Sequence, residues 1–149
     1  HSAGGQFVHR WALLGGKKNV DVIAVANSGW FTMPDRDIDY PYGIKNVGIT
    51  DEELGEAFAK PVILFMGEKD VERKPPFRDT PEADAQGMNR MERCTNYFRQ
   101  CKAKAEELRV PFRWKLETVE GAAHQGVKMA EGAAAYIFRK SSEDGSRRM

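Results

Sequence analysis

The segment Pro61–Asp70, PVILFMGEKD, is the part of the sequence that decides the fold. Five consecutive apolar residues, Val62 to Met66, precede a polar turn. A short apolar run that ends in turn residues is typical of a strand buried on both faces of a parallel sheet. The turn that follows places Asp70 just beyond the carboxyl end of the predicted strand. In parallel sheets this is the edge at which active sites form.

Helices and strands alternate on both sides of this segment. Two further strands are expected, at Val20–Ala26 and at Phe112–Val119, the second of which alternates apolar and polar residues. Four helices are expected: Gln6–Leu14, a short helix opened by a Thr50–Glu53 capping box, Pro81–Arg109 and Gly126–Lys140. The alternation predicts an α/β sandwich with about three mainly parallel strands and flanking helices.

Length and charge are those of one ordinary domain. The chain has 149 residues, 41% of them apolar, and we expect a single domain over residues 1–140 with a flexible polar tail at 141–149. The net charge of +1 gives no electrostatic reason to expect a nucleic-acid partner. No apolar run approaches the roughly 18 residues of a membrane span, so no membrane partner is expected either.

No metal or cofactor is expected. The two cysteines, Cys94 and Cys101, stand seven residues apart in a predicted helix, and no CxxC-type motif is present. Seven helical residues place the two Cα atoms roughly 10 Å apart, which is too far for a disulfide. Both are therefore expected to be reduced thiols.

Three side chains with hydrolytic potential stand beside predicted element ends. Ser2 precedes the first helix, Asp70 follows the second strand, and His124 follows the third. Their order along the chain, Ser, Asp, His, is the order used by α/β-hydrolases. Two alternatives remain. Ser2 could serve only as the N-cap of the first helix, and Asp79 or Asp84 could be the acid in place of Asp70.

The motifs around these residues resemble one family. HSAGG (1–5) matches the nucleophile elbow G-x-S-x-G without its first glycine, PVILFMGEKD matches an acid turn, and VEGAAHQGVKMAEGAAAYIF (119–138) matches a histidine loop with its helix. The chain therefore resembles the C-terminal half of a bacterial α/β-hydrolase of the esterase and polyester-depolymerase-like kind. The resemblance implies Ser2 as nucleophile, Asp70 as acid, His124 as base and the Ala3 amide as an oxyanion-hole donor.

This resemblance implies hydrolysis of small or polymeric carboxylic esters through an acyl-enzyme. A long loop, residues 27–47, follows the first strand at the same sheet edge and is rich in aromatic residues. We expect Trp30 and Met33 of this loop to line the substrate site as an apolar wall. The alternative is ordinary packing of the loop against the body.

In the resembled family, the elbow strand and the loop with the second oxyanion donor come before the elbow. We therefore expect a segment to precede His1 in the parent protein. Without it, Val20–Ala26 is an apolar edge strand, which favours self-association. The chain is thus expected either to lack this segment or to form a homo-oligomer. The alternative function is a catalytically silent half-domain that acts by association.

Overall fold

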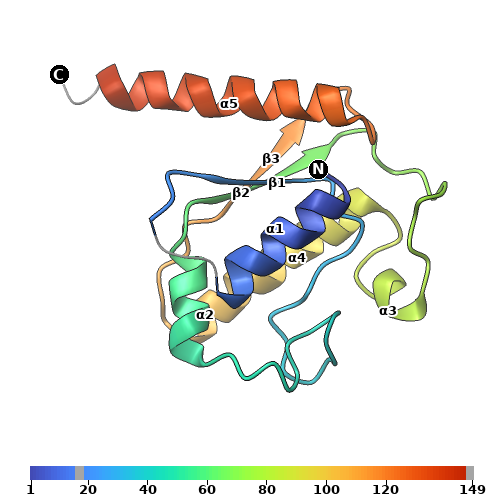
Figure 1. Ribbon diagram of the computed structural model, residues 1–149, viewed down its shortest axis with the longest axis vertical. Helices are drawn as coiled ribbons and strands as arrows, with labels where there is room; N and C mark the ends of the chain where they lie inside the picture. The colour runs from blue at the N-terminus through green and yellow to red at the C-terminus, as the bar shows by residue number, and fades with distance from the viewer. Residues whose placement is uncertain (16–18, 147–149) are drawn as a thin grey trace.

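The computed structural model describes residues 1–15 and 19–146, of which residues 141–146 are described by their backbone alone. Three parallel strands form one sheet in the order β1 (Ile23–Ala26), β2 (Val62–Gly67) and β3 (Lys115–Val119). Figure 1 shows the sheet between two layers of helices. The predicted α/β sandwich with three parallel strands is confirmed.

Helices cover both faces of the sheet. On one face lie α1 (Ala3–Leu14), α2 (Asp51–Phe58) and α4 (Arg90–Glu107), and on the other lies α5 (Gly126–Ser146) (Figure 1). The capping box predicted for α2 is present, because Thr50 and Glu53 exchange side-chain and backbone hydrogen bonds. No helix among residues 1–15 and 19–146 is both long enough and apolar enough to cross a lipid bilayer.

The apolar run of β2 is explained by burial on both faces. Val62 and Leu64 point into the main core beneath α1, α2 and α4, whereas Ile63 and Phe65 point into a second core beneath α5. All four are buried. Each such side chain contributes about 1.5–3 kcal/mol through its burial. The central strand therefore ties the two layers together and fixes the position of its carboxyl end.

The predicted helix Pro81–Arg109 is wrong as a single element. The chain forms a short helix, α3 (Pro81–Asp84), then turns and begins α4 at Arg90. Gly87 has a φ of 148°, in the region that favours glycine, and a Cβ there would lie 2.8 Å from the backbone N of Arg93. Asn89 then caps α4 by accepting a hydrogen bond from the N–H of Glu92.

Both terminal helices are longer than predicted. α1 begins at Ala3 rather than Gln6, so that Ser2 directly precedes its first residue. α5 continues through Ser146 rather than ending at Lys140, which makes the first part of the predicted tail helical. Residues 147–149 of that tail lie outside the described residues. The two cysteines are free and buried on α4, as expected.

The predicted edge strand is confirmed. β1 pairs with β2 on one side, and the described part of the chain supplies no strand for the other side. Ala24 is exposed in the middle of β1, and Val22 just before it is 37% exposed. Self-association through this edge stays a prediction.

The contact between α1 and β1 leads to a prediction about stability. A Cβ on Gly5 would lie 2.7 Å from both the Ala26 carbonyl oxygen and Ser28 Oγ, whereas a Cβ on Gly4 would have nothing within 4 Å. We expect Gly5→Ala to lower the free energy of unfolding by about 1–3 kcal/mol through overpacking. Gly4→Ala, the matched control, should raise it by about 0.5–1 kcal/mol. Urea unfolding measures both, and equal effects would contradict this packing.

Candidate active site

The three predicted side chains meet at the carboxyl edge of the sheet. Ser2 Oγ lies 3.0 Å from His124 Nε2, and His124 Nδ1 lies 2.8 Å from Asp70 Oδ2. Ser2 precedes α1, Asp70 follows β2, and His124 stands between β3 and α5. Parallel strands bring these positions together although Ser2 and His124 are 122 residues apart in sequence. The alternative acid Asp84 instead pairs with Arg73 and Arg93.

Ser2 has an unusual backbone conformation. Its φ of 55° and ψ of −121° are rare for a residue with a side chain, and such conformations cost on the order of 1–3 kcal/mol. The Ser2 N–H donates to the Ala26 carbonyl at the end of β1, over 3.0 Å. Its side chain makes no cap hydrogen bond to α1, so the hydroxyl is available to His124. The capping alternative therefore does not describe this serine.

The amide of Ala3 lies at the start of α1. The first N–H groups of a helix have no partner within the helix and carry its partial positive charge. The N–H of Gly4 is already used by the His1 carbonyl, at 3.0 Å. The N–H of Ala3 makes no hydrogen bond within residues 1–15 and 19–146. It is the amide directly after Ser2, and it can donate to an oxygen that develops negative charge there.

Asp70 is buried and has a second partner that sequence reasoning missed. Only 3% of the residue is exposed, and Arg90 Nη1 donates to its Oδ1 over 3.2 Å. Arg90 also donates to the Pro76 carbonyl, which fixes the loop after Asp70. A buried carboxylate requires such partners. An arginine at the start of a helix has no sequence signal that separates it from a surface arginine.

Asn27 connects the segments that carry the three side chains. Its Nδ2 donates to the Ala123 carbonyl (3.1 Å), next to His124, and its Oδ1 accepts from the Gly67 N–H (2.8 Å), three residues before Asp70. Its backbone N–H donates to the Phe65 carbonyl. Asn27 is 3% exposed and has a φ of 44°, a value that asparagine tolerates. Its only sequence signal is a polar residue directly after a strand.

His9 is a structural residue of α1. Its Nδ1 donates to the Gly5 carbonyl and its Nε2 accepts from the Thr32 N–H. Burial, together with the charge of Arg10, lowers the pKa of His9 to about 3. The imidazole is therefore neutral near pH 7, and its hydrogen bonds attach the loop after β1 to the start of α1.

The predicted apolar wall has a different environment from the one expected. Met33 is 5% exposed and lies in the main core. Trp30 is 7% exposed and packs on Tyr42, with the guanidinium groups of Arg10 and Arg78 over its ring. Within the described residues, neither Trp30 nor Met33 has a hydrogen bond or ring contact with Ser2 or His124. Packing of the loop accounts for both positions, and a role in substrate binding stays a prediction.

Two solved bacterial structures superpose closely on the chain. Poly(aspartic acid) hydrolase-1 from Sphingomonas sp. KT-1 is 35% identical, with a TM-score of 0.88 over 93% of this chain and 53% of that one. The poly(3-hydroxybutyrate) depolymerase of Bordetella parapertussis is 33% identical, with a TM-score of 0.88 over 94% of this chain and 47% of that one. The chain thus spans about half the length of these structures. It matches no protein-family model and no curated protein.

Proposed function

Because the chain has the α/β-hydrolase fold of bacterial depolymerase-type hydrolases over about half their length, we propose that it cleaves carboxylic esters as a serine hydrolase. The observation that carries this proposal is the continuous set of hydrogen bonds from Ser2 Oγ through the His124 ring to Asp70. A serine hydroxyl becomes an effective nucleophile when a neighbouring imidazole takes its proton during attack.

Each group has a distinct role in this mechanism. Asp70 accepts from Nδ1–H of His124, which leaves Nε2 free to accept the Ser2 proton. Ser2 Oγ forms a bond to the substrate carbonyl carbon, and the oxyanion that results accepts from the Ala3 N–H. When the tetrahedral intermediate collapses, the ester C–O bond breaks and the leaving alcohol takes the proton from His124. Water then loses a proton to the same imidazole and forms a bond to the acyl carbon. The bond between this carbon and Ser2 Oγ breaks, Ser2 Oγ takes the proton back from His124, and the acid is released.

A burst experiment tests the acyl-enzyme. With p-nitrophenyl butyrate we expect rapid release of nitrophenol, in an amount close to the concentration of the chain, before a slower steady rate. The amount of nitrophenol released in the burst should stay the same when the substrate concentration is doubled. If neither a burst nor a steady rate above buffer is seen, the ester-hydrolase proposal is wrong for this chain.

Amide hydrolysis is a second candidate, because the polymers named for the two solved structures contain different linkages. Poly(3-hydroxybutyrate) is a polyester, whereas the units of poly(aspartic acid) are joined by amide bonds. A serine hydrolase cleaves both linkages through an acyl-enzyme. An amine leaves only after it is protonated, so amide cleavage depends more strongly on His124 as a general acid. The butyrate p-nitrophenyl ester and the matching p-nitroanilide share an acyl group and separate the two activities.

The alternative of a catalytically silent half-domain is supported by a different observation. The edge of β1 is unpartnered in the described part of the chain, and such an edge can pair with another chain. A second copy, or the strand expected before Ser2, would cover Val22 and Ala24. The silent alternative predicts association without a burst, so the experiment above also separates these two functions.

The role of Asn27 gives a further prediction. We expect Asn27→Ala to lower kcat for an activated ester about a hundredfold with little change in KM, because displacement of the His124 loop misplaces the base. The matched control is Asn46→Ala. Asn46 also has a positive φ, 60°, but is exposed in a loop. A kcat for Asn27→Ala equal to that of the control would show that the Asn27 side chain does not position the site.

A further inference from the structure

Two arginines from distant parts of the sequence lie over one tryptophan. The guanidinium carbon of Arg10, on α1, is 4.3 Å from the centre of the Trp30 ring. That of Arg78, in the loop before α3, is 5.0 Å from the same centre. Cation–π contacts of this kind hold a guanidinium in place while leaving its edge free for hydrogen bonds.

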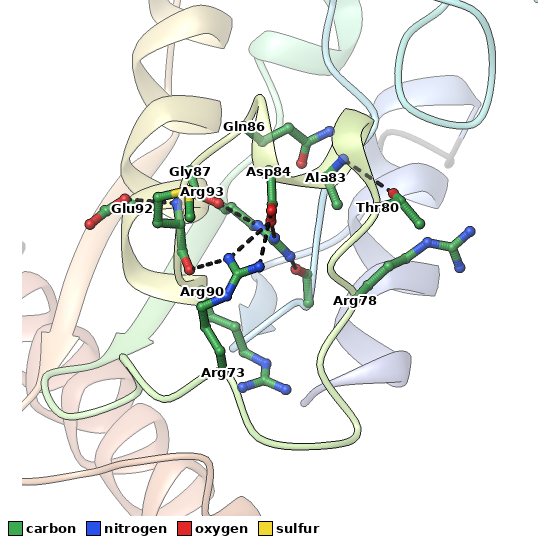
Figure 2. A network of polar contacts seen from close by, with 12 residues as sticks. Arg73, Arg78, Thr80, Ala83, Asp84, Gln86, Gly87, Arg90, Glu92 and Arg93 are labelled. Carbon is green, nitrogen blue, oxygen red and sulfur yellow. Dashed lines mark hydrogen bonds and ion pairs between the residues drawn. The ribbon is translucent and has the colours of Figure 1, made fainter.

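The other buried or partly buried arginines in this region already have carboxylate partners. Figure 2 shows Arg73 and Arg93 converging on Asp84. Arg90 pairs with Asp70. In the same view Arg78 stands apart from this network, with its guanidinium turned away from Asp84. Asp84 and Asp70 therefore pair with arginines other than Arg10 and Arg78.

Among residues 1–15 and 19–146, Arg10 and Arg78 have only neutral hydrogen-bond partners. Arg10 Nε donates to Thr32 Oγ1 over 3.0 Å, and Arg78 Nε donates to Tyr42 Oη over 2.7 Å. Within the described residues, neither forms an ion pair with Asp or Glu. Two positive charges thus share one aromatic ring without a counter-ion.

The hydrogen-bonding capacity of the Arg10 guanidinium is not fully used. Arg10 Nη2 is buried and has no hydrogen-bond partner in the part of the chain that the structure describes. Burial, with a smaller contribution from the charge of Arg78, lowers the pKa of Arg10. Buried donors without acceptors are costly, and a charged donor more so than a neutral one. A ligand carboxylate beside the pair would supply the missing negative charge.

Arg10 of this pair lines a surface hollow that begins at Ala3, the residue directly after Ser2. This shallow hollow of about 390 Å³ is lined by α1 residues from Ala3 to Trp11, including Arg10, and by Tyr40. Seven residues of helix separate Ala3 from Arg10, which corresponds to roughly 10 Å along α1. The hollow therefore runs from Ala3, whose amide is the proposed oxyanion donor, to Arg10, over the length of a short acyl chain. Arg78 shares the Trp30 ring with Arg10.

We propose that Arg10 and Arg78, held on Trp30, form a carboxylate-binding subsite that selects substrates with an acidic group on the acyl chain. This inference rests on the proposed hydrolase function and names a substrate class for it. Planar guanidinium groups pair with planar carboxylates through two parallel hydrogen bonds. In this proposal the Trp30 ring positions the two guanidinium groups by cation–π contact, whereas the sequence predicted an apolar wall at Trp30.

Matched substrates test the subsite. The mono-p-nitrophenyl esters of adipic, suberic and sebacic acid carry a distal carboxylate, and the p-nitrophenyl esters of hexanoic, octanoic and decanoic acid are their neutral counterparts. We expect at least one acidic ester to have the higher kcat/KM, and Arg78→Gln to lower that preference about tenfold or more. The kcat/KM of the neutral esters should change much less in Arg78→Gln than that of the acidic ester. High salt should weaken the preference.

Two controls separate this inference from the proposed function. Arg99→Gln removes an exposed positive charge from α4 and should leave the preference unchanged. Titration with suberate, followed by tryptophan fluorescence, reports binding without hydrolysis. It should show saturable quenching that Arg78→Gln weakens and that Trp30→Phe removes.

Cleavage of neutral esters with no acidic preference and no suberate binding would overturn the subsite and leave the hydrolase proposal standing. Suberate binding without cleavage of any ester would support the subsite and overturn the proposed function.

Discussion

Replacing Ser2 by Ala is expected to reduce ester hydrolysis to the level of buffer, a loss on the order of 10⁶-fold in kcat where the wild type is that active. The reason is that no other hydroxyl lies within hydrogen-bond distance of His124 Nε2 in the described residues. His124→Ala should cause a loss of similar size. The double variant should be no worse than either single one, because nucleophile and base act as one unit. Steady-state kinetics on p-nitrophenyl butyrate measure all three.

Ser28→Ala is the control for the serine variant. Ser28 is buried near Gly5, and its hydroxyl has no hydrogen-bond partner among the described residues. Its removal should therefore leave kcat within about twofold. If Ser2→Ala retained the wild-type rate while Ser28→Ala lost it, the assignment of the nucleophile would be wrong.

Replacing Asp70 by Asn is expected to lower kcat by about 10⁴-fold while the chain still folds. An amide in place of the carboxylate can present an N–H to His124 Nδ1. The imidazole then carries its proton on Nε2, and a protonated Nε2 cannot take the proton of the Ser2 hydroxyl. The change also leaves Arg90 buried without its counter-ion. Loss of one partner of a buried pair costs about 3–5 kcal/mol, which urea unfolding should detect.

A second substitution separates these two effects. Arg90→Met in the Asp70→Asn background removes the unpaired charge and should restore much of the free energy of unfolding, but none of the activity. Recovery of kcat together with stability would show that Asp70 acts by holding the loop in place rather than by orienting His124.

The main elements and the three candidate side chains could be predicted because each has a local signal. The apolar run of β2 requires burial on both faces, and its last residues place Asp70 at the sheet edge. Ser2 and His124 likewise stand within a few residues of an element that the sequence marks. At Gly87 the local signal was present but was outweighed by the helical pattern on both sides. The spacing of Asn89 and Glu92, three residues apart, is the sequence feature that indicates the start of a new helix after Gly87.

The residues that could not be predicted act through contacts between distant segments. Asn27 and Arg90 hold the His124 loop and Asp70 across 96 and 20 residues of sequence. Trp30 was expected to be an open wall because its aromatic character is visible in the sequence. The arginines over its ring come from α1 and from the loop before α3, and nothing local to Trp30 indicates them. Only the folded arrangement shows which charges are left without partners.

The proposed hydrolysis depends on Ser2 as a nucleophile that His124 activates. The most direct test is to treat the wild-type chain with a fluorophosphonate and to locate the adduct by tandem mass spectrometry of its peptides. We expect a single adduct on Ser2, formed much more slowly in His124→Ala. An adduct on any other residue, or a Ser2 peptide that remains unmodified while the probe is consumed, would contradict this expectation.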